Sequence, residues 1–223
     1  MRSLFILCLA LLSLNLSAQK ELKEGVMTMK MTMSTDNEQA KAALAMMGDM
    51  TVTSYFKGDK SRTEQSHQMT GSNISIVDNS SKKILVLMDN PMMGKKYTET
   101  DLNVSEEDLK NVTVTPKGDT KTIAGYTCEG FDVLVKRDGI ETKMVMYVTD
   151  KILAPNQNTA PLGGKIKGFP LYTVVNAKQG PIDMQITMEV TEVKDQSVDD
   201  SKFEMKVPEG YEKLTPPKPA GID

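Results

Sequence analysis

Few side chains in this sequence could carry out chemistry. The chain of 223 residues contains a single histidine, His67, and two cysteines, Cys8 and Cys128. A histidine-dependent triad needs a nucleophile and an orienting acid around the histidine, and His67 lies instead in a polar stretch beside Ser66. One cysteine and one histidine are also too few for the usual zinc site. We therefore expect neither a metal nor a cofactor. A hydrolase that uses His67 is the least favoured of the hypotheses.

The carboxylates are abundant but scattered. Asp78, Asp89 and Asp150 stand at the ends of predicted strands, where a carboxylate typically caps a turn. Neither a glycine-rich phosphate loop nor a Gly-x-Ser-x-Gly motif occurs. Cys128 could be a reactive thiol if it were exposed beside positive charge, but its neighbours favour a buried small hydrophobe. The sequence predicts a protein that is not an enzyme.

Methionine is the one residue type with functional promise. The chain has 17 Met and no Trp, and several methionines recur at every second position of predicted strands. Flexible thioethers suit a surface that meets varied acyl chains, and the alternative is that they simply fill a core. The predicted lining of an apolar cavity consists of Met27, Met29, Met31, Leu44, Met47, Val52, Met144, Met146, Met184 and Met188.

Residues 1–18 have the pattern of a signal peptide. Arg2 precedes a short apolar run that ends in small residues at Ala18, so we expect export to the periplasm or cell exterior with cleavage after Ala18. The remaining chain is the length of one domain, over residues 19–214, followed by a Pro-rich disordered tail over 215–223. The net charge of −3 argues against nucleic acid as a partner, and no segment is long enough for a transmembrane helix.

The elements that would position these residues are mostly strands. Met27 to Met33 alternate with polar residues, which predicts a half-buried antiparallel strand. Ala40, Ala43, Leu44 and Met47 follow a helical period, which predicts a helix over Thr35–Gly48 with a capping box at Thr35. Ile84–Met88 does not alternate, so we expect a central strand covered on both faces. Ala124-Gly125 predicts a corner, Gly130 a bulge, and Asn156–Lys167 a lid or gate.

The pattern as a whole predicts a mainly β (α+β) fold. Roughly ten short strands with one or two small helices favour a strongly curved antiparallel sheet or a barrel.

Three groups of residues resemble an uncharacterised family of exported Gram-negative proteins. They are Gly58-Asp-Lys-Ser-Arg62-Thr-Glu64, Lys121-Thr-Ile-Ala-Gly125-Tyr-Thr-Cys128, and Gly168-Phe-Pro-Leu171 followed by Phe203-Glu-Met-Lys-Val-Pro208-Glu-Gly210-Tyr211. The resemblance implies a fold similar to the LolA/LolB lipoprotein carriers, an unclosed half-barrel whose concave side is covered by helices. In those carriers an arginine on the sheet helps to hold the lid shut, and Arg62 and Arg137 are the arginines that follow the predicted signal peptide here.

Two functions follow from this resemblance together with the methionine pattern. The first is an envelope protein that holds a lipid or a lipoprotein acyl chain in a Met-lined cavity. The second is an envelope sensor or assembly protein that uses the same fold to bind a protein partner and no lipid. An open hollow inside the sheet favours the first, and a filled one favours the second.

Overall fold

The computed structural model describes residues 20–137, 140–157, 159–179 and 182–214. The predicted signal peptide and the predicted Pro-rich tail therefore lie outside the described residues. The strands are β1 (Glu24–Thr35), β2 (Met50–Lys57), β3 (Lys60–His67), β4 (Gly71–Asp78), β5 (Lys83–Asn90), β6 (Gly94–Asp101), β7 (Val112–Ile123), β8 (Tyr126–Arg137), β9 (Ile140–Thr149), β10 (Phe169–Gln179), β11 (Ile182–Lys194) and β12 (Glu212–Lys213). The helices are α1 (Glu38–Met47) and α2 (Glu106–Lys110), with short 3-10 helices η1 (Ala160–Leu162) and η2 (Asp200–Phe203).

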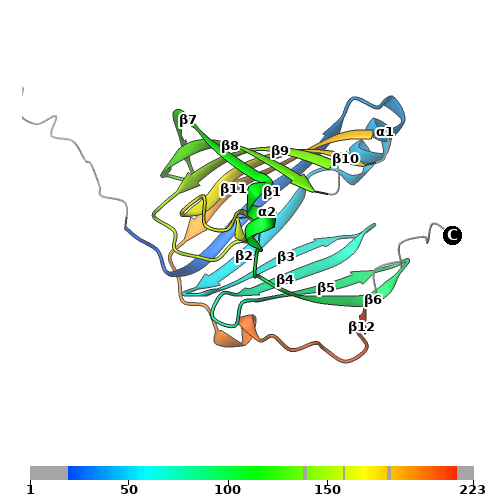
Figure 1. Cartoon of the computed structure of the whole chain (residues 1–223). Coiled ribbons are helices and arrows are strands. Elements are labelled where there is room, and N and C mark those ends of the chain that lie inside the picture. Colours follow the sequence, from blue (N-terminus) through cyan, green and yellow to red (C-terminus); the bar gives the residue numbers. More distant parts are fainter. Residues whose placement is uncertain (1–19, 138–139, 158, 180–181, 215–223) are drawn as a thin grey trace, which may run out of the picture.

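All twelve strands form one unclosed sheet, in the order β12-β6-β5-β4-β3-β2-β1-β11-β10-β9-β8-β7. Neighbouring strands are antiparallel except for the β12–β6 pair. Two meanders thus extend from β1, one through β2 to β6 and the other from β7 back to β11. The sheet bends so that β7–β11 form an upper wall and β3–β6 a lower wall, with α2 between them (Figure 1). The prediction of a mainly antiparallel β fold is confirmed.

Consecutive strands form hairpins in both meanders. β8 pairs with β9 and β10 with β11, and the corner at Ala124-Gly125 is the two-residue turn of the β7–β8 hairpin, with φ of 47° and 84°. The register of β7 against β8 shifts between Pro116 and Thr120, opposite Gly130, which confirms the predicted bulge. Two strands were not predicted, the two-residue β12 and the longer β7. The polar residues and Pro116 of β7 are typical of loops. An edge strand tolerates both.

The helix over Thr35–Gly48 needs a correction. Thr35 belongs to β1 and donates a hydrogen bond to the Asp183 carbonyl, and the N-cap is Asn37, whose Oδ1 accepts from the backbone N–H groups of Gln39 and Ala40. Gly48 ends the helix as expected, with φ of 66°. The helix was also expected to cover the concave side, but none of its residues is buried, and it lies beyond the ends of β1 and β2 (Figure 1). Half of its apolar stripe is alanine, at Ala40 and Ala43, which offers little area to bury.

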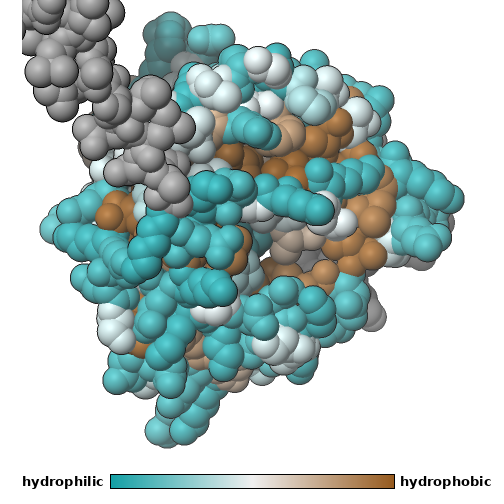
Figure 2. All heavy atoms as spheres, turned by 90° about the vertical axis from the view of Figure 1, so that its left-hand side faces the viewer, coloured by the Kyte–Doolittle hydropathy of each residue, from teal (hydrophilic) through white to brown (hydrophobic). Residues whose placement is uncertain are grey.

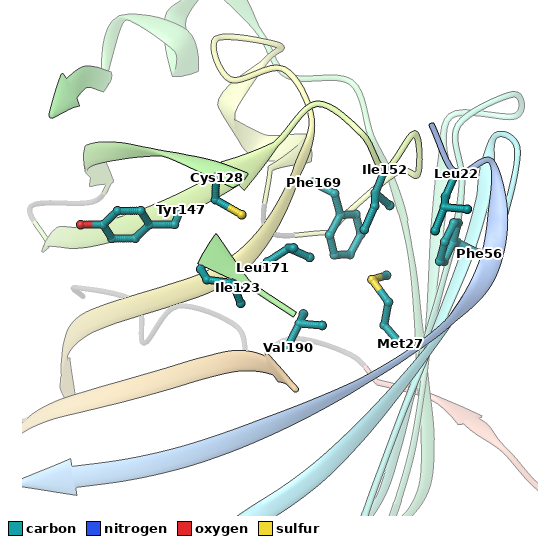
Figure 3. Packing of buried hydrophobic residues seen from close by; sticks show 10 residues of the cluster. All are labelled: Leu22, Met27, Phe56, Ile123, Cys128, Tyr147, Ile152, Phe169, Leu171 and Val190. Atoms are coloured by element: carbon teal, nitrogen blue, oxygen red, sulfur yellow. The ribbon is translucent and has the colours of Figure 1, made fainter. Parts of the chain in front are cut away.

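The core has three clusters of buried residues. The largest closes one end of the space between the walls, where Met27, Phe56 and Phe169 converge with Leu22 and Ile152 (Figure 3). The second lies under the segment that follows β9 and contains Leu162 and Ile166.

The third cluster is on the opposite face of the sheet. There Ile76, Leu85 and Leu87 pack against Met205 and Val207 of the C-terminal segment. This segment runs beneath the lower wall (Figure 1), and so the chain covers the outer face of β4 and β5 with its own residues.

Candidate functional site

One face of the sheet lies between the two walls, and the pairing of neighbouring strands shows which residues belong to it. Val86 on β5 pairs through Ser75 and Thr63 with Ser54 on β2, and Ser54 pairs with Met27 on β1. Directly paired residues point to the same side of a sheet, as do residues two apart along a strand. The same reasoning carries the inner face from Met33 through Ile186 and Val175 to Met144. We call this face, which lies between the two walls, the inner face.

The inner face borders a hollow of about 680 Å³. Its apolar lining comes from the upper wall and from the segment after β9, namely Val112, Val135, Met144, Pro161, Leu162 and Val175. An adjoining space of about 370 Å³ is bordered by Ile84 and Val86 of β5 and continues past Leu102 and Val104. Four residues border both spaces (Asp108, Arg137, Gln157 and Pro161), so the two parts form one hollow between the walls.

Figure 2 shows hydrophobic side chains gathered around an opening between the upper and lower parts of the molecule. Ile84, Val86 and Val175 are only half-buried. β5 was expected to be covered on both faces, and the structure explains its unbroken apolar sequence differently. Leu85 and Leu87 pack under the C-terminal segment, whereas Ile84 and Val86 border the hollow.

One edge of the hollow is charged. Arg137 at the end of β8 lies 3.4 Å from Asp108 of α2, with Nη2 facing Oδ1. Hydrogen bonding to Ser105 and the charge of Arg137 lower the pKa of Asp108, so its carboxylate is ionised. Both side chains are largely exposed, so water and salt screen the pair and it contributes little to stability. Arg62 is far from this edge in the fold, because it pairs with Glu64 and Lys202 on the outer face.

The segment Asn156–Lys167, predicted as a lid or gate, packs against the upper wall. Leu162 and Ile166 are buried against Val112 and Met146. Lys165 Nζ donates to the carbonyls of Leu109 and Val112, at 2.7 and 2.5 Å. The segment is therefore anchored at its centre, and it narrows the hollow without filling it.

The structure distributes the ten predicted lining residues over several places. Met144 borders the hollow, and Met184 borders a separate recess of about 570 Å³ near the β10–β11 hairpin. Met27 and Met146 are fully buried in the core. Met29, Met31 and Met188 are half-buried on the inner face, and Val52 is buried there. Leu44 and Met47 lie on α1, away from the hollow.

Several residues that border the hollow were not predicted. Val112, Val135 and Val175 alternate with polar residues like any half-buried strand position, so nothing in the sequence distinguishes them. Ile84 and Val86 could have been found, because the Ile84–Met88 run has more apolar residues than one covered face needs.

The residues whose side chains could take part in chemistry make structural contacts instead. Cys128 is fully buried, and burial raises the pKa of its thiol to about 11, which makes it unreactive. His67 Nε2 lies 2.9 Å from the Met47 carbonyl, and Nδ1 accepts from the Met69 N–H. Asp78 caps its turn by accepting from the N–H groups of Ser80 and Ser81. Within the residues that the structure describes, no three His, Cys, Asp or Glu side chains are grouped as a metal site.

A family model matches residues 23–160, which run from the start of β1 to the segment that borders the hollow. The chain belongs to DUF4412, a domain of unknown function. The predicted membership of an uncharacterised family is thereby confirmed. The DUF4412 match includes Met144 and Arg137 of the hollow but ends before β10 and β11. None of the curated proteins matches this DUF4412 chain.

The DUF4412 chain is also similar to parts of solved structures. With PNGF-II it shares 14% identity at a TM-score of 0.48, over 85% of this chain and 31% of that one. With MucB the values are 8% and 0.41, over 85% and 60%. With the Mycobacterium tuberculosis lipoprotein LppX they are 9% and 0.31, over 75% and 86%. The chain thus spans about a third of PNGF-II and three fifths of MucB, and these low scores leave the site to be argued from its own residues.

No helix in the described part of the DUF4412 chain is long and apolar enough to span a bilayer.

Proposed function

We propose that this protein is an exported, non-enzymatic binding protein that holds an apolar ligand, such as a lipid or a lipoprotein acyl chain, in the hollow between its two walls. One observation carries the proposal. The inner face of β5 is apolar and only half-buried at Ile84 and Val86, although the chain covers the opposite face of the same strand with its own C-terminal segment.

The size and lining of the hollow support this proposal. Small-molecule sites typically occupy about 300–1,000 Å³ and are lined mainly by apolar side chains with a few polar groups. The hollow has volumes of about 680 and 370 Å³ in its two parts. Burying a chain of about 14 methylenes would contribute about 10 kcal/mol before ordering costs, at about 0.8 kcal/mol for each methylene.

The charged edge suits the polar end of such a ligand. Arg137 is exposed beside the apolar lining and is held only by a weak pair with Asp108. A carboxylate or phosphate could therefore compete for its guanidinium, which binds both groups well. The methionines of the inner face, Met29, Met31 and Met188, would extend the apolar surface with flexible side chains.

A fluorescent fatty acid in solution tests the proposal. We expect a dansylated long-chain fatty acid to bind the protein and Val86→Trp to weaken this binding about tenfold or more, because the indole occupies the hollow. The matched control is Thr113→Trp, since Thr113 is exposed on β7 and borders no hollow. Equal binding by both variants, or no binding by the unchanged protein, would refute an apolar site between the walls.

A further inference from the structure

The exposed large apolar side chains are concentrated at one end of the sheet. Met46 is 76% exposed, Met92 is 94% exposed, and Met69 and Met93 are each 58% exposed. Single exposed hydrophobic residues are ordinary on a soluble protein, but several at one end mark an interaction surface.

Hydrogen bonds between neighbouring connections bring these four methionines together, although they belong to three different connections. His67 Nε2 lies 2.9 Å from the Met47 carbonyl, which joins the β3–β4 turn to the last turn of α1. Asn90 Nδ2 donates to the Thr70 carbonyl at 3.1 Å, which joins that turn to the β5–β6 turn. We call this set the methionine rim, comprising Met46, Met69, Met92 and Met93. It lies at the right-hand end of the sheet in Figure 1.

Charge distinguishes the methionine rim from the opposite end of the same strands. Two of the three connections at the rim, Gln68-Met69-Thr70 and Asn90-Pro91-Met92-Met93-Gly94, contain no charged residue, whereas the third, which carries Met46, contains Asp36, Glu38, Lys41 and Asp49. At the other end, the β2–β3 turn contains Asp59 and the β4–β5 turn contains Lys82. The hairpin turns of the β2–β6 meander therefore differ in charge between its two ends.

The hollow reaches the same end of the molecule. β1 ends at this end of the sheet, where Thr35 pairs with Met184 near the start of β11. Asn176, near the end of β10, pairs with Lys143, near the start of β9. The β8–β9 connection therefore joins strand ends that lie at this same end. Arg137, Thr142 and Met144, which border the hollow, belong to the strand ends on either side of that connection.

We propose that the methionine rim docks on the surface of a phospholipid bilayer. Separate tips with flexible thioethers, two of them uncharged, can enter the soft interface between head groups and acyl chains independently of one another, as interfacial apolar side chains do. Lys95, next to the β5–β6 turn, has its Nζ 5.9 Å from the centre of the Tyr211 ring and no carboxylate within salt-bridge distance among the described residues, so it is the lysine best placed to meet a lipid phosphate. In this orientation the strand ends that border the hollow, at Arg137 and Thr142, face the membrane. The inference deepens the proposed function by naming the source of the ligand.

The absence of tryptophan from the chain permits a direct test. Met92→Trp puts the only indole on the methionine rim, and Ser81→Trp puts it on the exposed β4–β5 turn at the opposite end. With vesicles of phosphatidylethanolamine and phosphatidylglycerol, we expect the emission of Met92→Trp to shift to shorter wavelength. Brominated acyl chains should quench it about threefold more than they quench Ser81→Trp, because only the rim enters the interface.

A second measurement uses loss of binding. The combined variant Met46→Ser, Met69→Ser, Met92→Ser and Met93→Ser should partition into these vesicles about tenfold more weakly or less, since apolar area drives insertion. Equal behaviour of the two tryptophans, or unchanged partitioning of the serine variant, would overturn membrane docking. If the rim does not dock on vesicles, the protein can still bind the fatty acid in solution. If the fatty acid does not bind, the vesicle experiment still measures docking, so each proposal can fail without the other.

Discussion

At the scale of single residues, the backbone around the hollow depends on glycines that other residues cannot replace. Gly168, which leads into β10, has φ of +105°, and a Cβ there would collide with the Thr149 carbonyl oxygen. Phe169 pairs with Thr149 in the sheet, so the two backbones cannot separate without losing the register of β9 and β10. Those two strands supply Met144 and Val175 to the hollow.

Gly168→Ala should therefore lower the free energy of unfolding by about 2–4 kcal/mol, because it adds a backbone collision to the left-handed strain. Gly164→Ala is the matched control. Gly164 has φ of +77° in the same segment, but a Cβ there meets nothing within 4 Å, so the expected loss is about 1 kcal/mol. Urea unfolding measures both variants. Similar losses for the two would contradict the proposed contact with Thr149.

At the scale of elements, an ionic cluster fastens the C-terminal segment to β3. Glu64 Oε1 lies 2.5 Å from Arg62 Nε and 3.3 Å from Lys202 Nζ, and Arg62 Nη1 donates to the Lys202 carbonyl. Lys202 Nζ also lies 4.3 Å from the centre of the Tyr55 ring. Burial raises the pKa of the Glu64 carboxyl, but Arg62 and Lys202 lower it more, so its net shift is downward.

A carboxyl with a lowered pKa in the folded state stabilises that state above its unfolded pKa, and the contribution is lost as the pH falls through the folded pKa. Glu64→Gln should therefore cost about 1 kcal/mol near pH 7, allowing for partial exposure. The cost should shrink as the solution is acidified below pH 4.5, the usual value for this group.

The control is Glu192→Gln, whose ion pair with Lys194 is about half exposed. Urea unfolding across the acidic range measures the difference between each variant and the unchanged protein. A cost for Glu64→Gln that stays constant with pH would mean that the cluster does not act through charge.

At the scale of the whole molecule, the sheet has two apolar faces, and the chain covers one of them more completely than the other. The C-terminal segment covers the outer face of the lower wall and buries Phe203, which is 2% exposed. In the described part of the chain, Leu162, Ile166 and the end cluster around Met27 pack on the inner face without filling it, which leaves the hollow. If the proposed function holds, the fold therefore separates stability, on the outer face, from ligand binding, on the inner face.

Phe203→Ala should destabilise the protein by about 3–5 kcal/mol, as truncation of a buried aromatic side chain does. Lys206→Ala, in the same segment but exposed, should change stability by about 0.5 kcal/mol or less. Thermal unfolding checks both variants. Below its unfolding temperature, Phe203→Ala should bind the dansylated fatty acid as the unchanged protein does. Loss of binding in the folded variant would mean that the two faces are coupled.

The sequence by itself determined the local structure and the family. Period-two alternation, glycines at the Ala124-Gly125 turn and the β-bulge at Gly130 depend on neighbouring residues along the chain, and they predicted a mainly antiparallel β fold. Membership of an uncharacterised family also followed from residues in the sequence. The residues of the cavity did not, because alternation tells which residues share a face but not what lies opposite that face.

Only the tertiary structure decided which apolar positions are packed and which border space. Met27 and Met31 share one stripe of β1, yet Met27 meets Phe169 and Ile152 at the closed end, whereas Met31 stays half-buried. Leu85 and Val86 are neighbours in sequence, but the C-terminal segment covers one and the hollow receives the other. The meeting of distant segments causes these differences, since the bend of the sheet brings β5 opposite β8–β10, and this long-range geometry is not encoded in any local pattern.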